Sequence, residues 1–190
     1  MCTDDPIVEE IAGDDRTPRV VLEKLAESNN YYVRYAVAYN ESTPKTTLCR
    51  LSRDSRTCPA VAANESTPPR CLAELARHPK ESIRLRVARN RSTPASALRE
   101  LAKDENERIR MAVAEHPSTP PRVIDELARS EDPSIRWSAA VNDSIPPKAL
   151  LHLSQDDNER VRAIALERTI HLLAANVKII RTTVPLSSCY

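Results

Sequence analysis

The sequence predicts an all-α fold, an α-solenoid of about six two-helix repeats of 24–26 residues each. One observation behind this prediction is a proline that recurs at intervals of 24 or 26 residues, as in proteins made of stacked repeats. Another is the spacing of the leucines after each proline, which places them on one face of a helix. The recurring prolines are Pro18, Pro44, Pro68, Pro94, Pro120 and Pro146.

The first helix of each repeat, here called helix A, is predicted to begin at this proline. A threonine precedes five of the six prolines, and threonine as the N-cap with proline in the first helical position favours a helix start. Two apolar columns follow. The first contains Leu22, Leu48, Leu72, Leu98, Ile124 and Leu150, and the second contains Leu25, Leu51, Leu75, Leu101, Leu127 and Leu153.

The second helix, here called helix B, is predicted to follow a polar N-cap residue. A β-branched residue on its core face is followed by arginine in five repeats. Asparagine is predicted to end helix B in the left-handed conformation, which this residue tolerates, and His116 replaces it once. The N-caps are Asn30, Asn106, Asp132 and Asn158, the β-branched residues are Val33, Ile83, Ile109, Ile135 and Val161, and the asparagines are Asn40, Asn64, Asn90 and Asn142.

The stretch "NESTP" occurs at residues 40–44 and again at 64–68, and we interpret it as the joint between helix B and the next helix A. The solenoid is predicted to span residues 1–168, with a half-repeat at 1–14 and a capping helix and tail at 169–190. Repeats are predicted to start near residues 17, 43, 67, 93, 119 and 145. The repeat around residues 52–64 is irregular, because it lacks two loop residues and has Cys58 in place of the arginine.

The repeats resemble the leucine-rich repeat variant family, a relative of the HEAT and armadillo solenoids. The stretches that carry the resemblance are "VRYAVAYNESTPKTTLCRL", "IRLRVARNRSTPASALRELA" and "IRMAVAEHPSTPPRVIDELA". The resemblance implies a right-handed superhelix in which α-helices alternate with 3₁₀ helices, although the longer period leaves open whether helix B is α or 3₁₀. The founding type of the family carries an N-terminal cysteine cluster with an iron–sulfur centre, but here Cys2 alone lies in that region, so no cofactor is expected.

The composition narrows the class of protein further. The net charge is +1, no apolar run is long enough for a membrane helix, and the N-terminus does not resemble a signal peptide, so a cytoplasmic location without membrane association is expected. The five cysteines are Cys2, Cys49, Cys58, Cys71 and Cys189, and they are expected to be free thiols. No zinc-like spacing and no catalytic constellation occurs, which predicts a protein that is not an enzyme and holds no metal.

The first candidate for a functional surface is the arginine column of helix B, which would form a ladder along one edge of the repeats. These arginines either bind acids and carbonyls in neighbouring loops, as HEAT-type repeats do, or form a track for anions. The ladder consists of Arg34, Arg84, Arg110, Arg136 and Arg162.

The second candidate is an outward stripe on helix B, opposite its β-branched core face. Two of its columns vary in size and polarity, which is typical of a recognition surface, although packing between repeats could bury the larger members. The stripe consists of Tyr35, Tyr39, Leu85, Arg89, Met111, Glu115 and Trp137. The sequence therefore predicts a non-enzymatic repeat scaffold that binds a protein or peptide through helix B. The alternative is a nucleic-acid-binding HEAT-like protein that uses the arginine column, which the near-zero net charge disfavours.

Overall fold

The computed structural model describes residues 6–183, and the side chains of residues 6–174. Over this range all thirteen helices are α and no residue lies in a strand. The chain divides into two compact units, residues 1–120 and 121–190. The N-terminal unit contains α1 (Pro6–Gly13), α2 (Arg19–Leu25), α3 (Tyr31–Tyr39), α4 (Lys45–Leu51), α5 (Cys58–Ala63), α6 (Pro69–Leu75), α7 (Glu81–Arg89), α8 (Ala95–Leu101) and α9 (Glu107–Glu115). The C-terminal unit contains α10 (Pro121–Leu127), α11 (Pro133–Val141), α12 (Pro147–Leu153) and α13 (Glu159–Thr183).

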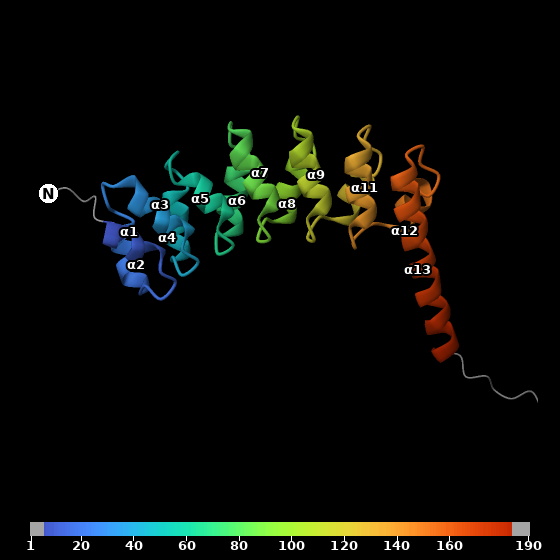
Figure 1. Cartoon of the computed structure of the whole chain (residues 1–190), viewed down its shortest axis with the longest axis horizontal. Helices are drawn as coiled ribbons and strands as arrows, with labels where there is room; N and C mark the ends of the chain where they lie inside the picture. The colour runs from blue at the N-terminus through green and yellow to red at the C-terminus, as the bar shows by residue number, and fades with distance from the viewer. Residues whose placement is uncertain (1–5, 184–190) are drawn as a thin grey trace, which may run out of the picture. The chain divides into compact units, whose positions relative to one another are not determined.

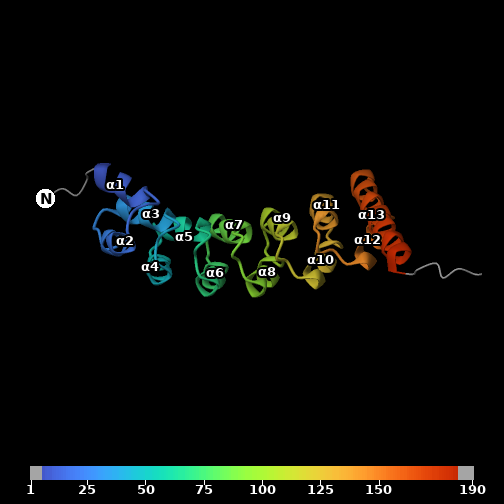
Figure 2. The same ribbon diagram turned by 90° about the horizontal axis from the view of Figure 1, so that it is seen from below.

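The N-terminal unit stacks its helices in two rows, as Figures 1 and 2 show. One row holds the B helices α3, α5, α7 and α9, and the other holds the A helices α2, α4, α6 and α8. The predicted core columns lie between the rows: Leu48, Leu72 and Leu98 of helix A and Val37 and Val87 of helix B are completely buried. Because each repeat buries its apolar face against its neighbours, the stack forms one continuous core. The predicted α-solenoid is thereby confirmed.

The C-terminal unit repeats the same pattern over two further helix pairs. Its core includes Ile124, Ile135 and Leu150, all of them buried. The last B helix, α13, packs against α11 and α12 and runs on without a break to Thr183. The expectation of a separate capping helix from residue 169 is therefore wrong, because residues 169–183 continue this helix, and the predicted tail beyond residue 183 lies outside the described residues.

The starts of the helices follow the sequence closely for helix B and differ for helix A. Asn30, Asn106 and Asp132 cap helix B as predicted, each with a side-chain oxygen that accepts from the backbone N–H two residues on. In helix A the proline itself, such as Pro44, is the N-cap, with no side-chain cap hydrogen bond. The predicted threonine cap is therefore wrong: the hydroxyl of Thr43 instead donates to the carbonyl of Val37 at 2.6 Å.

The joint between helix B and the next helix A is held by asparagine. The Asn90 Nδ2 donates to the carbonyls of Ala62 and Asn64, both at 2.9 Å, and its Oδ1 accepts from the backbone N–H of Ser92. Asn40 and Asn64 each make the equivalent three hydrogen bonds. The prediction of a left-handed conformation is wrong, since Asn90 is extended at φ −74° and ψ 120°. Asparagine occurs here because its side chain joins consecutive repeats.

Both helices of each described repeat are α, so the alternation with 3₁₀ helices that the resemblance implies does not hold over residues 6–183. The question left open for helix B is answered in favour of α: α7, a helix B, has 9 residues, against 7 for α8, a helix A. No described helix combines the length and the apolar character that crossing a membrane requires.

Candidate functional site

The arginine ladder lies at the edge where each loop enters helix B. In its best-formed rung the Arg84 guanidinium contacts the Asp104 carboxylate at 2.6 Å and donates to the carbonyls of His78 and Pro79. The side chains of Arg84 and Asp104 are 13% and 7% exposed. Equivalent rungs join Arg34 to Asp54 at 2.9 Å and Arg136 to Asp156 at 2.7 Å.

The electrostatics of these rungs favour the ionised pair. Burial raises the pKa of Asp104, but hydrogen bonds from the Arg84 side chain and the backbone of Asn106 outweigh it, so the pKa lies below its usual value. The pKa of Asp156 is likewise lowered, mainly by the hydrogen bond from Arg136. Arg110 and Arg162 donate to loop carbonyls. The ladder donors therefore serve contacts within the protein, which is the structural interpretation of this column.

The irregular repeat has a different rung. Cys58 replaces the arginine and His78 replaces the aspartate, and the Cys58 Sγ lies 3.9 Å from the His78 Nε2. Cys58 is 1% exposed, and this burial raises the pKa of its thiol. A protonated, buried thiol is a poor nucleophile, so the pair fills the position of a rung rather than forming a reactive site.

A disulfide joins Cys49 of α4 to Cys71 of α6, with 5.8 Å between the Cα atoms. The expectation of free thiols is therefore wrong for these two residues, while Cys58 is free as expected. Cys2 and Cys189 lie outside the described residues. The bond links two consecutive A helices and spans the irregular repeat.

The stripe predicted on helix B lies at the surface in the N-terminal unit. Tyr39 is 61% exposed and Arg89 and Glu115 are exposed too. Tyr35, Leu85 and Met111, one turn earlier on the same helices, are half-buried. None of the six is buried between repeats, so the two columns form a surface that combines aromatic, aliphatic and charged side chains.

The C-terminal unit contributes the remaining member of the stripe. Trp137 lies on α11 and is 43% exposed, and Val141, one turn later, is 37% exposed. Ser138, between them in sequence, is buried. The large ring of Trp137 is therefore available to solvent on this unit by itself.

Two surface arginines, Arg86 of α7 and Arg91 in the loop after it, were missed by the sequence analysis of the stripe. Arg86 and Arg91 are exposed, and neither side chain has a hydrogen bond or ion pair among the described residues. A signal for Arg86 was present, because the equivalent position in three other repeats is Ala36, Ala60 and Ala112. A charged residue in a column of alanines is not needed for packing.

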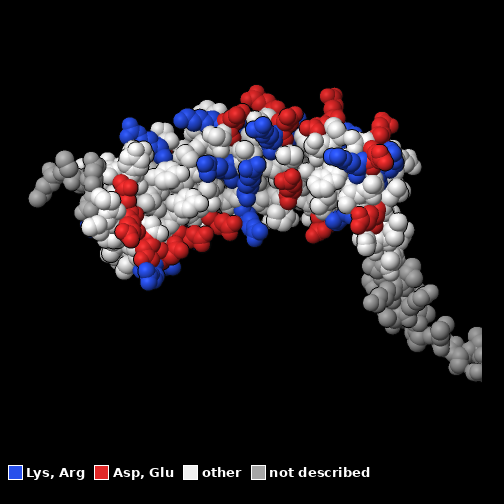
Figure 3. Space-filling view, viewed as in Figure 1, with Lys and Arg blue, Asp and Glu red and all other residues white. Residues whose placement is uncertain are grey.

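Arg86 and Arg89 border a hollow of about 390 Å³ on the helix B side of the N-terminal unit. Its lining comes from the end of α5 and from α7, with Asn90 as a buried wall. Leu85 and Ala63 are the apolar lining residues, and Arg86, Arg89 and Glu65 are the charged ones. The space-filling view shows Lys and Arg gathered over this part of the unit (Figure 3).

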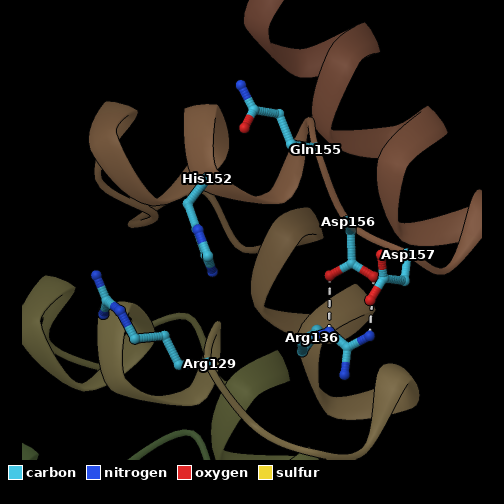
Figure 4. A pocket seen from close by; sticks show the side chains of 6 residues that line it. All are labelled: Arg129, Arg136, His152, Gln155, Asp156 and Asp157. Atoms are coloured by element: carbon cyan, nitrogen blue, oxygen red, sulfur yellow. Dashed lines mark hydrogen bonds and ion pairs between the residues drawn. The ribbon is translucent and has the colours of Figure 1, made fainter.

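A second hollow, of about 450 Å³, lies in the C-terminal unit and is shown in Figure 4. Arg136 and Asp156 meet there as a ladder rung, and His152 and Arg129 line another side. Arg129 is held by Asp125 at 2.6 Å. No side chain drawn there is arranged as a nucleophile against a base, and among the described residues no cluster of His, Cys, Asp and Glu could hold a metal ion.

The fold has counterparts among solved structures. A leucine-rich repeat variant, described as having a novel repetitive protein structural motif, superposes with a TM-score of 0.64 at 24% identity, over 88% of this chain and 67% of that chain. An engineered protein matches 89% of this chain and 97% of its own at 17% identity, with a TM-score of 0.48. The Escherichia coli protein YibA matches 92% of this chain and 79% of its own at 15% identity, with a TM-score of 0.49.

No protein-family model and no curated protein sequence matches the chain. Likeness at these identities shows fold and not activity. The superposition with the leucine-rich repeat variant supports the α-solenoid fold described above. The chain is accordingly an α-solenoid whose fold is similar to that of a leucine-rich repeat variant.

Proposed function

We propose that the chain is a non-enzymatic scaffold that binds a protein or peptide partner through the outward face of helix B. Repeat solenoids commonly act by presenting a long surface. The observation that carries the proposal is the exposure of large side chains on this face, with Tyr39 at 61% in one unit and Trp137 at 43% in the other. Aromatic residues are enriched where protein interfaces gain most of their binding energy.

The ladder supports a protein partner over nucleic acid. A nucleic-acid surface neutralises phosphates with available cations. The guanidinium groups of Arg34, Arg84 and Arg136 are instead paired with carboxylates. The outward face also combines both signs of charge, with Glu115 near Met111 and Arg89 near Leu85. A mixed surface of this kind suits protein recognition better than a polyanion.

A photo-crosslinking amino acid placed at Tyr39 tests the proposal, with the same group at Val20 as the matched control. Val20 lies on α2, outside the B row, and is 71% exposed. In extracts of the native cell, we expect position 39 to crosslink a defined protein and position 20 to crosslink none above background. Equal crosslinking from both positions, or none from position 39, would contradict the proposal.

A further inference from the structure

We propose that the hollow between α5 and α7 binds an acidic peptide segment, in which aspartate or glutamate lies beside an apolar side chain. This rests on the proposed function and names the chemistry of the partner. The hollow combines cations with an apolar floor. A purely apolar segment would leave the cations unpaired, and a basic segment would be repelled by them.

Three arginines in the second half of α7 and the loop after it are not paired within the part of the protein that the structure describes. Arg86, Arg89 and Arg91 are exposed, and their side chains have no ion pair or hydrogen bond within residues 6–174. Arg84, on the same helix, is instead held by Asp104 and two carbonyls. Unpaired guanidinium groups are well suited to bind carboxylates, because each can donate two parallel hydrogen bonds.

The fold does not require these charges. Where α7 has Arg86, helices α3, α5 and α9 have Ala36, Ala60 and Ala112. Where it has Arg89, α5 has Ala63. The positions accept a methyl group in neighbouring repeats, so the two guanidinium groups are additions to the surface rather than parts of the core.

The apolar part of the site comes from the irregular repeat. α5 is 6 residues long, against 9 for α7, and its outward positions hold the small side chains of Pro59 and Ala63. Small side chains on α5 leave space beside Leu85, which is half-buried in the floor of the hollow. An apolar side chain of the partner would bury this floor, and its neighbouring carboxylates would then reach the arginines.

The walls of the hollow are already fixed. Asn90 joins the end of α7 to the carbonyls of Ala62 and Asn64, and the Ser92 hydroxyl donates to the carbonyl of Glu65. Binding therefore need not order the two helices relative to each other, which lowers its entropic cost.

The charge of the loops sets the direction of the bound segment. At the same loop position, successive repeats of the N-terminal unit carry Asp15, Glu41, Glu65 and then Arg91. All four are exposed. Acidic side chains of the partner are repelled by the first three loops and attracted by the fourth. The acidic part should therefore lie over α7, and the apolar part toward the exposed ring of Tyr39.

Selection of random peptides displayed on phage against the full chain tests this inference. We expect enrichment of sequences with Asp or Glu beside Leu, Ile or an aromatic residue. A synthetic copy of the most enriched peptide is then measured by fluorescence anisotropy. The Arg86→Ala/Arg89→Ala variant, which copies residues found in other repeats, should bind it at least roughly tenfold more weakly. Arg99→Ala is the control, because it removes one surface arginine from α8, outside the hollow. Its affinity for the peptide should stay within about twofold of that of the unchanged protein.

Three other results of these binding measurements would each contradict a different part of the account. Enriched peptides without acidic residues, whose binding is lost in Tyr39→Ala, would overturn this inference and leave the proposed function standing. Binding of a phosphoserine version of the peptide but not of the glutamate version would overturn the assignment to carboxylates. Selected peptides whose binding responds neither to Tyr39→Ala nor to the arginine variant would contradict both proposals.

Discussion

Two neighbouring repeats, the regular one of α6 and α7 and the irregular one of α4 and α5, can be compared. They share the joint that follows helix B and differ at the loop that enters helix B. At the joint, Asn64 and Asn90 make the same three hydrogen bonds. At the loop edge, the regular repeat has the Arg84–Asp104 ion pair and the irregular one has the Cys58–His78 contact. Between these two repeats the joint is therefore the part that stays the same, and the ladder is the part that is exchanged.

The disulfide lies where the ladder is weakest. It links α4 to α6, the A helices on either side of α5, and so supplies a covalent connection across the repeat that lacks a ladder arginine. Disulfides persist mainly in oxidising compartments. The expected cytoplasmic location stays a prediction, and this bond argues against it.

The largest effect is expected at the joint. Asn64→Ala and Asn90→Ala should each lower the free energy of unfolding by about 3 kcal/mol, because two buried carbonyls lose their donor and a backbone N–H loses its acceptor. Chemical denaturation of the two variants checks this. If the joint works in the same way in both repeats, the two losses should agree within about 1 kcal/mol; a much smaller loss at Asn64 would show that the irregular repeat depends on other contacts.

The next largest loss of stability is expected from removal of the disulfide. Cys49→Ser/Cys71→Ser is expected to destabilise the protein by about 3 kcal/mol, because the loop that the bond closes regains its freedom in the unfolded chain. Urea titrations with and without a reductant give the measurement. In the double variant the reductant should have no further effect, and an unchanged midpoint on reduction of the original protein would contradict the role given to this bond.

A smaller effect is the difference in stability loss between two ladder variants, which distinguishes the contribution of the ion pair from that of the carbonyl contacts. Arg84→Ala loses both, whereas Arg110→Ala loses hydrogen bonds to the carbonyls of Asp104 and Glu105. We expect Arg84→Ala to cost about 1–2 kcal/mol more, since Asp104 is left buried without its cation. Thermal unfolding of both variants at neutral pH measures the difference, and equal losses would mean that the ion pair contributes nothing.

The smallest effect depends on pH and concerns His116, which takes the place of asparagine in one joint. Its Nδ1 accepts from the Ser118 N–H at 3.1 Å, and its Nε2–H therefore donates to the carbonyl of Asn90 at 2.9 Å. Burial lowers the pKa of this imidazole below its ordinary value of 6.5, although the carbonyl opposes the shift.

Because the folded form favours the neutral ring, the stability that His116 contributes is complete above about pH 6.5 and is lost as the pH falls through the lowered folded-state pKa. The slope is at most about 1.4 kcal/mol per pH unit. His116→Asn, which restores the residue of the other joints, should remove this acid sensitivity. Melting curves of both proteins between neutral and mildly acidic pH provide the check; identical pH dependence would refute the assignment to His116.

Much of the fold could be predicted from the sequence because the repeat period aligns the core columns. Leu72 and Val87 are buried as their spacing indicates, and Asn106 caps helix B. The roles of Thr43 and Asn90 were misread because their partners are carbonyls of an earlier turn or an earlier repeat, which a local reading of helix ends does not include.

The surface was harder to predict. The alignment of repeats identified Tyr39 and Arg89 as outward residues, and it also contained the signal for Arg86 as an arginine among alanines. The disulfide could not be predicted in this way. Cys49 and Cys71 occupy different columns of helix A, so their proximity depends on the offset between adjacent helices and not on the period.

The central claim, that the outward face of helix B binds a partner, is tested most directly by Tyr39→Ala and Trp137→Ala, one variant for each unit. Both side chains are exposed, so the account predicts that quantitative affinity capture from native extract loses the same bound protein in both variants. Val20→Ala should retain it, and all three should melt within a few degrees of the unchanged protein. Full capture by both variants, or a large fall in melting temperature for either, would show that this face is not the binding surface.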